Sequence, residues 1–193
     1  MMQTDYLDSA KKQFEYYKIL GEKTIAQLNE DQLFWQYNAE SNSIATIIKH
    51  LHGNMLSRWT DFLTSDGEKE WRKRDNEFEN DQNSMKQVLQ LWDEAWNCLF
   101  STLNSLNEND LMKTVYIRNQ GHSVVEAINR QLAHYPYHIG QIVFLGKMMC
   151  NEKWTSLSIP RGVSKEYNAE KFAQARHKEH FTEEFLKNKS KDE

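Results

Sequence analysis

Two histidines, His134 and His138, lie four residues apart in the segment His134-Tyr135-Pro136-Tyr137-His138. On an α-helix, residues i and i+4 project from one face about 6 Å apart, so two imidazoles can converge on one transition-metal ion. Apolar residues share this face, where an imidazole without a partner would be costly. The spacing predicts part of a metal site, although two histidines bonded to backbone or water at the edge of a core would show the same spacing.

A third ligand has to come from another helix, and the candidates are His50 and His52. They are two residues apart and therefore point about 200° away from each other around a helix, so at most one of them can face the site. Helical periodicity places His52 closer than His50 to the apolar stripe that starts at Ile44. Asn54 follows His50 by one turn and could orient a ligand. The residues alone leave the choice between the two histidines open.

Four segments carry apolar residues at the spacing of an amphipathic helix, namely residues 5–28, 44–62, 85–106 and 123–149. Ser43 is a good N-cap for the second helix, and Ser123 with Glu126 forms a capping box at the start of the fourth. Each apolar stripe must be covered by another helix. The sequence therefore predicts an all-α fold, an antiparallel four-helix bundle with an additional helical segment at the C-terminal end.

The connecting segments are polar. Residues 64–83 combine turn residues with dense charge, and within them Trp71-Arg72-Lys73-Arg74-Asp75 is expected to be a solvated, salt-bridged loop because acidic residues adjoin it. Residues 114–118 have a strand-like composition but are expected to be extended connecting chain. Residues 165–187 are expected to form a weaker helix.

Composition limits the function classes. The chain has 193 residues, a net charge of −4, 7 Gly, 2 Pro and 2 Cys. We expect a single domain over residues 1–193, with a bundle core at about 5–149 and a C-terminal extension at about 150–187. The charge argues against a nucleic-acid partner, and the absence of a long apolar run argues against a membrane partner. The opening residues lack a signal-peptide pattern, so a cytoplasmic location is expected, with Cys98 and Cys150 as buried thiols.

The chain resembles the DinB superfamily over roughly residues 5–149. Two segments carry the resemblance: the one that ends in His50-Leu51 and the one that runs from His134 to Gly140-Gln141. Residues 53–63, 66–69 and 157–162 are similar to an uncharacterised bacterial branch of it, known mainly as a domain of unknown function. The resemblance implies a DinB-like bundle in which a helix-two histidine and an H-x-x-x-H pair bind a divalent metal at one end. By position in the superfamily pattern, these ligands are His50, His134 and His138. The resemblance therefore favours His50 over His52 as the third ligand.

Three neutral imidazoles leave a zinc or nickel ion with an open position, which is typical of a site that does chemistry. The resemblance implies an enzyme with a small-molecule substrate, either a metal-dependent transferase of low-molecular-weight thiols or a hydrolase. The alternative is a non-catalytic protein that binds metal or takes part in stress-related interactions. Asn54, Gln141 and Arg161 are candidates to orient the ligands or contact the substrate, and Arg161 is a candidate binder of a substrate carboxylate. No catalytic residue is assigned. Superfamily members are often dimers, so a homodimer is an open expectation.

Overall fold

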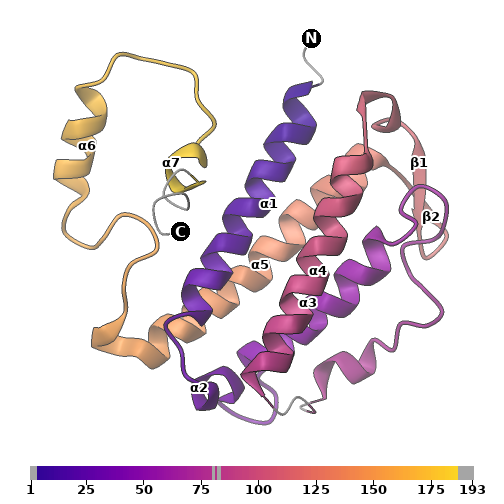
Figure 1. Cartoon of the computed structure of the whole chain (residues 1–193), viewed down its shortest axis with the longest axis horizontal. Coiled ribbons are helices and arrows are strands. Elements are labelled where there is room, and N and C mark those ends of the chain that lie inside the picture. Colours follow the sequence, from indigo (N-terminus) through magenta and orange to yellow (C-terminus); the bar gives the residue numbers. More distant parts are fainter. Residues whose placement is uncertain (1–3, 80, 82–83, 187–193) are drawn as a thin grey trace.

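The computed structural model describes residues 4–79, 81 and 84–186 and consists mainly of helices. Four of them are long: α1 (Thr4–Ile25), α3 (Ile44–Trp59), α4 (Met85–Ser105) and α5 (Val124–Cys150) (Figure 1). The short α2 (Glu30–Phe34) lies between α1 and α3. The prediction of an all-α bundle is confirmed. No helix among the described residues is long and apolar enough to cross a membrane.

Serine caps begin the helices that carry the site. Ser43 accepts a hydrogen bond from the Thr46 N–H at the start of α3. At the start of α5 the predicted capping box is present: the Ser123 N–H donates to Glu126 Oε2 at 2.7 Å, and the Glu126 N–H donates to Ser123 Oγ at 3.2 Å. These bonds satisfy backbone donors that have no partner within the helix. α5 continues through Pro136 to Cys150.

The directions of the helices differ in part from the predicted antiparallel order. Tyr6, near the start of α1, donates to the carbonyl of Val125, near the start of α5 (3.1 Å), so these two helices are parallel. Thr102, near the end of α4, donates to the carbonyl of Trp59, at the end of α3 (2.8 Å), so this pair is parallel too. The two pairs run in opposite directions (Figure 1). The connection after α3 makes this possible, because its described part returns to the first half of α3, where Asp81 pairs with Lys49, before α4 begins.

The core lies between the two pairs of helices. Large side chains that are almost completely buried include Phe14 from α1, Trp59 from α3, Trp96 and Leu99 from α4, and Tyr135 from α5. The Phe14 ring meets the Trp59 ring edge to face, with centroids 6.2 Å apart. Apolar burial of this extent is the main source of stability, and it fixes the spacing of α3 and α5 at the site.

Residues 114–123 form a β-hairpin, so the expectation of unpaired connecting chain is wrong. Strand β1 (Thr114–Ile117) pairs in antiparallel fashion with β2 (Gln120–Ser123). The two turn residues, Arg118 and Asn119, have φ values of 55° and 60°. Such a turn usually requires Gly or Asn at both positions. Here Asp66 stabilises it from the loop after α3, since its carboxylate accepts both turn N–H groups at 2.8 Å.

The connection between α3 and α4 is more ordered than a solvated loop. It contains a 3₁₀ helix, η1 (Asp75–Phe78), that packs against α3. The side chains of Arg72 and Glu77 are only 2% and 7% exposed and form an ion pair with Arg72 Nε 2.7 Å from Glu77 Oε1. The predicted salt bridges are therefore present, but this one is buried. The pair is out of water because it lies against α3.

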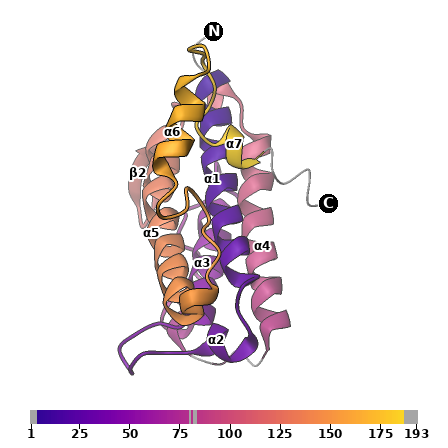
Figure 2. The same ribbon diagram turned by 90° about the vertical axis from the view of Figure 1, so that its left-hand side faces the viewer.

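The C-terminal segment contains two short helices instead of the one expected over residues 165–187. They are α6 (Ser164–Phe172) and α7 (Glu183–Leu186), while residue 187 lies outside the described residues. α7 lies against α1, where the rings of Tyr16 and Phe185 have centroids 5.1 Å apart (Figure 2). Two 3₁₀ turns, η2 (Glu108–Asp110) and η3 (Asn151–Lys153), follow α4 and α5.

Candidate metal centre

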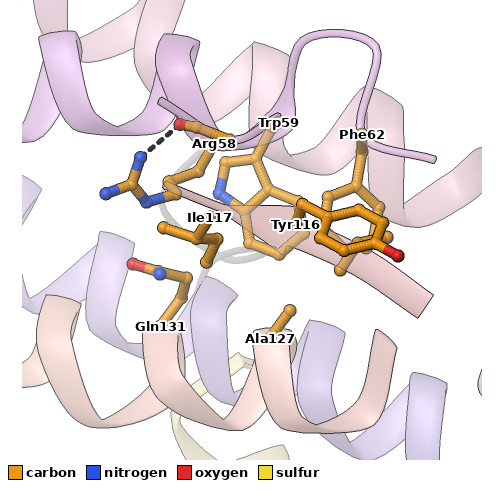
Figure 3. Close-up of a pocket in the computed structure, with 9 residues that line it drawn as sticks. Arg58, Trp59, Phe62, Tyr116, Ile117, Ala127 and Gln131 are labelled. Atoms are coloured by element: carbon orange, nitrogen blue, oxygen red, sulfur yellow. Dashed lines mark hydrogen bonds between the residues drawn. The ribbon is translucent and has the colours of Figure 1, made fainter. Parts of the chain in front are cut away.

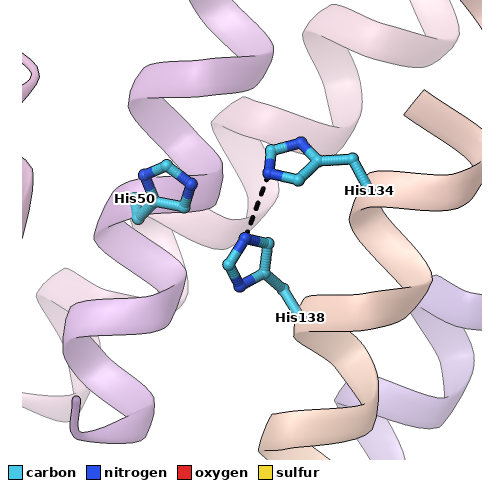
Figure 4. Close-up of side chains that lie close together, drawn as sticks. All are labelled: His50, His134 and His138. Carbon is cyan, nitrogen blue, oxygen red and sulfur yellow. Dashed lines mark hydrogen bonds between the residues drawn. The ribbon is translucent and has the colours of Figure 1, made fainter. Parts of the chain in front are cut away.

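The structure brings His50 from α3 together with His134 and His138 from α5 (Figure 4). One nitrogen from each ring lies within 4.8 Å of the other two. The Nε2 atoms of His134 and His138 are 3.1 Å apart. Two imidazole nitrogens bound to one tetrahedral zinc ion at 2.0–2.1 Å would be about 3.3 Å apart. The pair on α5 therefore already has nearly the separation that a shared ion requires.

The second nitrogen of each ring contacts an oxygen. His50 Nδ1 lies 2.9 Å from Glu77 Oε2, His134 Nδ1 lies 3.3 Å from Gln131 Oε1, and His138 Nδ1 lies 3.0 Å from Gln141 Oε1. An oxygen acceptor there requires the proton on Nδ1, which leaves Nε2 with a free lone pair. Without an ion, one of the α5 pair carries its proton on Nε2 and donates to the other ring. With both protons on Nδ1, the two Nε2 lone pairs face the same point, where a cation would bind both.

Glu77 is held in place by more than one contact. Arg72 binds both carboxylate oxygens, with Nε 2.7 Å from Oε1 and Nη2 3.0 Å from Oε2. Burial raises the pKa of Glu77, but hydrogen bonds from His50 and Arg72, together with the Arg72 charge, outweigh burial and hold this pKa below its usual value. Gly53 on α3 makes room for the carboxylate, since a Cβ atom there would lie 2.2 Å from Glu77 Oε1. A charged carboxylate thus fixes the ring and tautomer of His50.

The two histidines on α5 are neutral at pH 7. Burial, followed by the charges of His138 and His50 and of nearby arginines, lowers the pKa of His134 to about 4. Burial and the His50 charge also lower the pKa of His138, although its hydrogen bond with Gln141 acts in the other direction. Neutral imidazoles have the lone pair that a metal ion needs.

The other predicted site residues lie as follows. Asn54 borders the histidines, but its Oδ1 accepts from the Tyr135 hydroxyl (3.1 Å) and not from an imidazole. Gln141 contacts His138 through its Oε1. Arg161 is exposed in the turn after Pro160 and is not among the residues that line the cavity described below. His52 faces α4, where its Nε2 is 3.0 Å from Glu94 Oε2.

Sequence reasoning did not identify Glu77, Arg72 or Gln131 as parts of the site. Glu77 is 27 residues from His50 and lies in a charge-rich segment, where nothing marks one carboxylate above its neighbours. A glycine inside a helix is the one available signal, because Gly53 weakens α3 unless another group needs the space.

The three histidines open onto a cavity of about 350 Å³. The cavity lies between α3, α5, the η1 segment and the tip of the hairpin. The other described residues that line it are Asn54, Phe78, Gln131 and five arginines: Arg58, Arg72, Arg74, Arg118 and Arg130. The Phe78 ring stacks on His50 with centroids 5.1 Å apart. The cluster therefore has a side from which a small molecule could approach.

Comparison with known proteins gives a family but no function. No curated protein and no solved structure matches the chain. The model of one family, described as a protein of unknown function (DUF1572), matches residues 1–163. This match includes all four long helices, the hairpin, the connection that carries Glu77, and the three histidines. The chain therefore belongs to the DUF1572 family.

Proposed function

We propose that His50, His134 and His138 bind one divalent transition-metal ion. The observation that carries this proposal is the arrangement of the ring nitrogens: each Nδ1 contacts an oxygen, and two Nε2 atoms approach to 3.1 Å. A metal site requires three Nε2 lone pairs that converge, and the Nδ1–oxygen contacts leave the Nε2 atoms free to supply them, whereas without an ion one Nε2–H of the α5 pair donates to the other Nε2. Imidazole ligands suit zinc and nickel, as well as copper and iron, and zinc or nickel is the ion that we propose.

We further infer that the DUF1572 fold is DinB-like. The helices that supply the ligands agree with the superfamily pattern, since His50 lies on the second long helix and the His134/His138 pair on the fourth. Three protein ligands leave an open position on the ion, unlike the closed four-ligand set of structural zinc sites. The cavity lies next to that position.

On this basis we propose a metal-dependent enzyme that transfers a low-molecular-weight thiol to an electrophile or hydrolyses a small substrate. When bound, the ion would act as a Lewis acid that keeps a thiol or a water molecule in its reactive, deprotonated form. Glu77, Gln131 and Gln141 would hold the imidazoles with Nε2 toward the cavity. Phe78 and the α3–α5 contact would shield one side of the site from water.

The proposed thiol reaction also suggests the cellular compartment in which the protein works. Cys98 and Cys150 are free thiols, and low-molecular-weight thiols are kept reduced in the cytoplasm, which is where we place the protein. The homodimer suggested by the resemblance is tested by light scattering of the purified protein.

The test compares metal-free, zinc-loaded and nickel-loaded protein prepared without a histidine tag. We expect conjugation of a thiol such as cysteine to chlorodinitrobenzene, or ester hydrolysis, only in a metal-loaded form. His134→Ala should remove the activity and leave the helix content, because the core does not include this side chain. Metal-free protein that is as active as the loaded forms would refute the enzyme. An ion that binds and raises Tm without any turnover would support the non-catalytic alternative.

A further inference from the structure

The cavity beside the histidines is lined by most of the arginines of the chain. The sequence contains seven arginines and seventeen lysines, and five of the arginines but none of the lysines are among the eleven described residues that line the cavity. Random placement of seven residues among 193 positions would put about 0.4 of an arginine in a set of eleven. Since the protein as a whole is acidic, this concentration of positive charge is a local feature that calls for an explanation.

Two of these arginines, Arg58 and Arg72, form the inner wall. Their side chains are 7% and 2% exposed, and each lies within 3.3 Å of Glu68 Oε2. Arg58 also donates to the carbonyl of Gly67 (Figure 3). Its buried Nε has no hydrogen-bond partner among the described residues. Protein contacts therefore hold the inner wall in place, and part of its positive charge is already balanced by carboxylates.

The other three, Arg74, Arg118 and Arg130, are exposed at the rim and come from three different segments. Arg74 lies before η1 with its guanidinium 5.2 Å from the centre of the Phe78 ring. Arg118 is at the tip of the hairpin and lies 3.1 Å from Glu68 Oε2. Arg130 is one helical turn before His134 on α5. Segments that are far apart in the sequence thus direct guanidinium groups to the same opening.

The charges at the cavity do not cancel. Five guanidinium groups are set against the carboxylates of Glu68, Glu77 and Asp66, which leaves an excess of two positive charges before any metal is bound. The described lining itself contains no aspartate or glutamate. A partly enclosed cavity strengthens such a field because its walls have a low dielectric constant. An anion is therefore the ligand that this cavity stabilises most.

We propose that the cavity binds a small molecule that carries a carboxylate or phosphate group, and that Arg74 and Arg130 are its principal contacts. The use of arginine instead of lysine supports an oxyanion, because the planar guanidinium binds two oxygens of such a group at once. The volume of about 350 Å³ is at the lower end of the range for small-molecule sites. This assigns the anion-binding role to the cavity arginines and not to Arg161.

The inference rests on the proposed function in one respect: it makes the anion one end of the substrate whose other end reaches the histidines. The oxyanion would orient the substrate, so that its reacting group lies at the open side of His50, His134 and His138. The same geometry would exclude neutral molecules, since they leave the guanidinium groups without a partner.

Isothermal titration calorimetry of the full chain without a tag tests the proposal. The ligands are inorganic phosphate and malonate, with malonamide as the uncharged analogue, each titrated into metal-free and into zinc-loaded protein. The test variant is the double substitution Arg74→Gln/Arg130→Gln. The matched control is Arg161→Gln/Arg176→Gln, which removes the same charge from the two arginines outside the cavity. All four substituted residues are exposed, so the thermal unfolding curves should stay close to that of the unaltered chain.

We expect at least one of the two anions to bind and malonamide not to bind. The cavity variant should weaken anion binding about tenfold or more, and the control variant by less than about twofold. Tighter binding of malonate would assign a carboxylate, and tighter binding of phosphate would assign a phosphate group. No anion binding at millimolar concentration, or equal losses in both variants, would overturn the proposal.

Zinc uptake measured on the same samples separates this inference from the proposed function. If the protein takes up no zinc but binds an anion through Arg74 and Arg130, the metal site is wrong and the anion site stands. If zinc binds and no anion does, the anion site alone is wrong.

Discussion

The substitution Gly53→Ala is expected to have the opposite sign from most helical Gly→Ala changes. In an unobstructed helix the change stabilises by about 0.5–1 kcal/mol, because alanine loses less conformational freedom on folding. At position 53 the new Cβ would lie 2.2 Å from Oε1 and 2.7 Å from Cδ of Glu77. The carboxylate would have to move away from α3. Its hydrogen bonds with His50 and Arg72 resist this movement, so one or both of them must lengthen or break.

The expected size follows from these contacts. Overpacking in a filled space costs about 1–3 kcal/mol, which exceeds the gain from helix propensity. Loss of a partner that orients a metal ligand lowers metal affinity about 10- to 100-fold. We therefore expect Gly53→Ala to lower Tm by several degrees and to weaken zinc binding by one to two orders of magnitude. Differential scanning calorimetry and competition with a chelating dye measure the two effects.

Gly140→Ala on α5 is the matched control. Among the described residues, no heavy atom outside the helix lies within 4 Å of a Cβ atom built at this position. This variant should be unchanged in zinc affinity and more stable by about 0.5–1 kcal/mol. If Gly53→Ala instead behaves like Gly140→Ala, with higher Tm and unchanged zinc affinity, then Glu77 does not hold His50 as described here.

Three further predictions concern the site, the hairpin and the core. Glu77→Gln should weaken zinc binding about 10- to 100-fold in the same dye competition. Glu70 is an exposed acid in the same connection, so Glu70→Gln should leave zinc binding unchanged. Equal effects of the two substitutions would count against the role of Glu77 in holding His50. Slight burial of Asp66 raises its pKa, but hydrogen bonds from the N–H groups of Asn119, Glu68 and Arg118 outweigh burial and lower this pKa. The contribution of Asp66 to the stability of the folded protein is therefore present above about pH 4 and is lost as the pH falls through the lowered pKa. Asp66→Asn should therefore reduce Tm by about 2–4 °C at pH 7, and the difference between the two melting curves should shrink as the pH falls through the lowered pKa of Asp66; a constant difference would contradict this. Leu99→Ala, at a fully buried position of α4, should lower the free energy of unfolding measured in urea by about 2–5 kcal/mol, and a loss below about 1 kcal/mol would show that Leu99 is not packed in the core.

The helices and two of the three clustered histidines could be predicted from the sequence because local patterns encode them. The capping box at Ser123 and Glu126 is a short-range signal, and it places the start of α5 correctly. The spacing of His134 and His138 fixes their common face once the segment is helical. Local signals of this kind do not depend on the rest of the fold.

Periodicity pointed to the wrong histidine on α3 because it assumed that one face of the helix is buried. α3 is in fact covered on several sides, by α2, α4, α5 and η1. Polar residues such as His50, Asn54 and Arg58 are therefore buried outside the apolar stripe. The family position selected His50, which the structure places beside the α5 pair.

Long-range contacts account for the rest of what the sequence did not predict. The hairpin turn at Arg118 and Asn119 lacks the usual glycine because Asp66, more than fifty residues earlier, binds its N–H groups. Glu77 joins the site only because the connection after α3 folds back across Gly53. The residues around Asp66 and Glu77 carry no local signature of either contact, and the glycine at position 53 is the one sequence signal of the second.

The metal content of protein purified without a histidine tag, measured by plasma mass spectrometry, tests the central claim most directly. Samples of the unaltered chain, His50→Ala and His52→Ala are compared after incubation with zinc and removal of the excess. We predict about one equivalent in the unaltered chain and in His52→Ala, and a large loss in His50→Ala. Less than about 0.2 equivalents in the unaltered chain, or retention in His50→Ala with loss in His52→Ala, would contradict the metal centre described here.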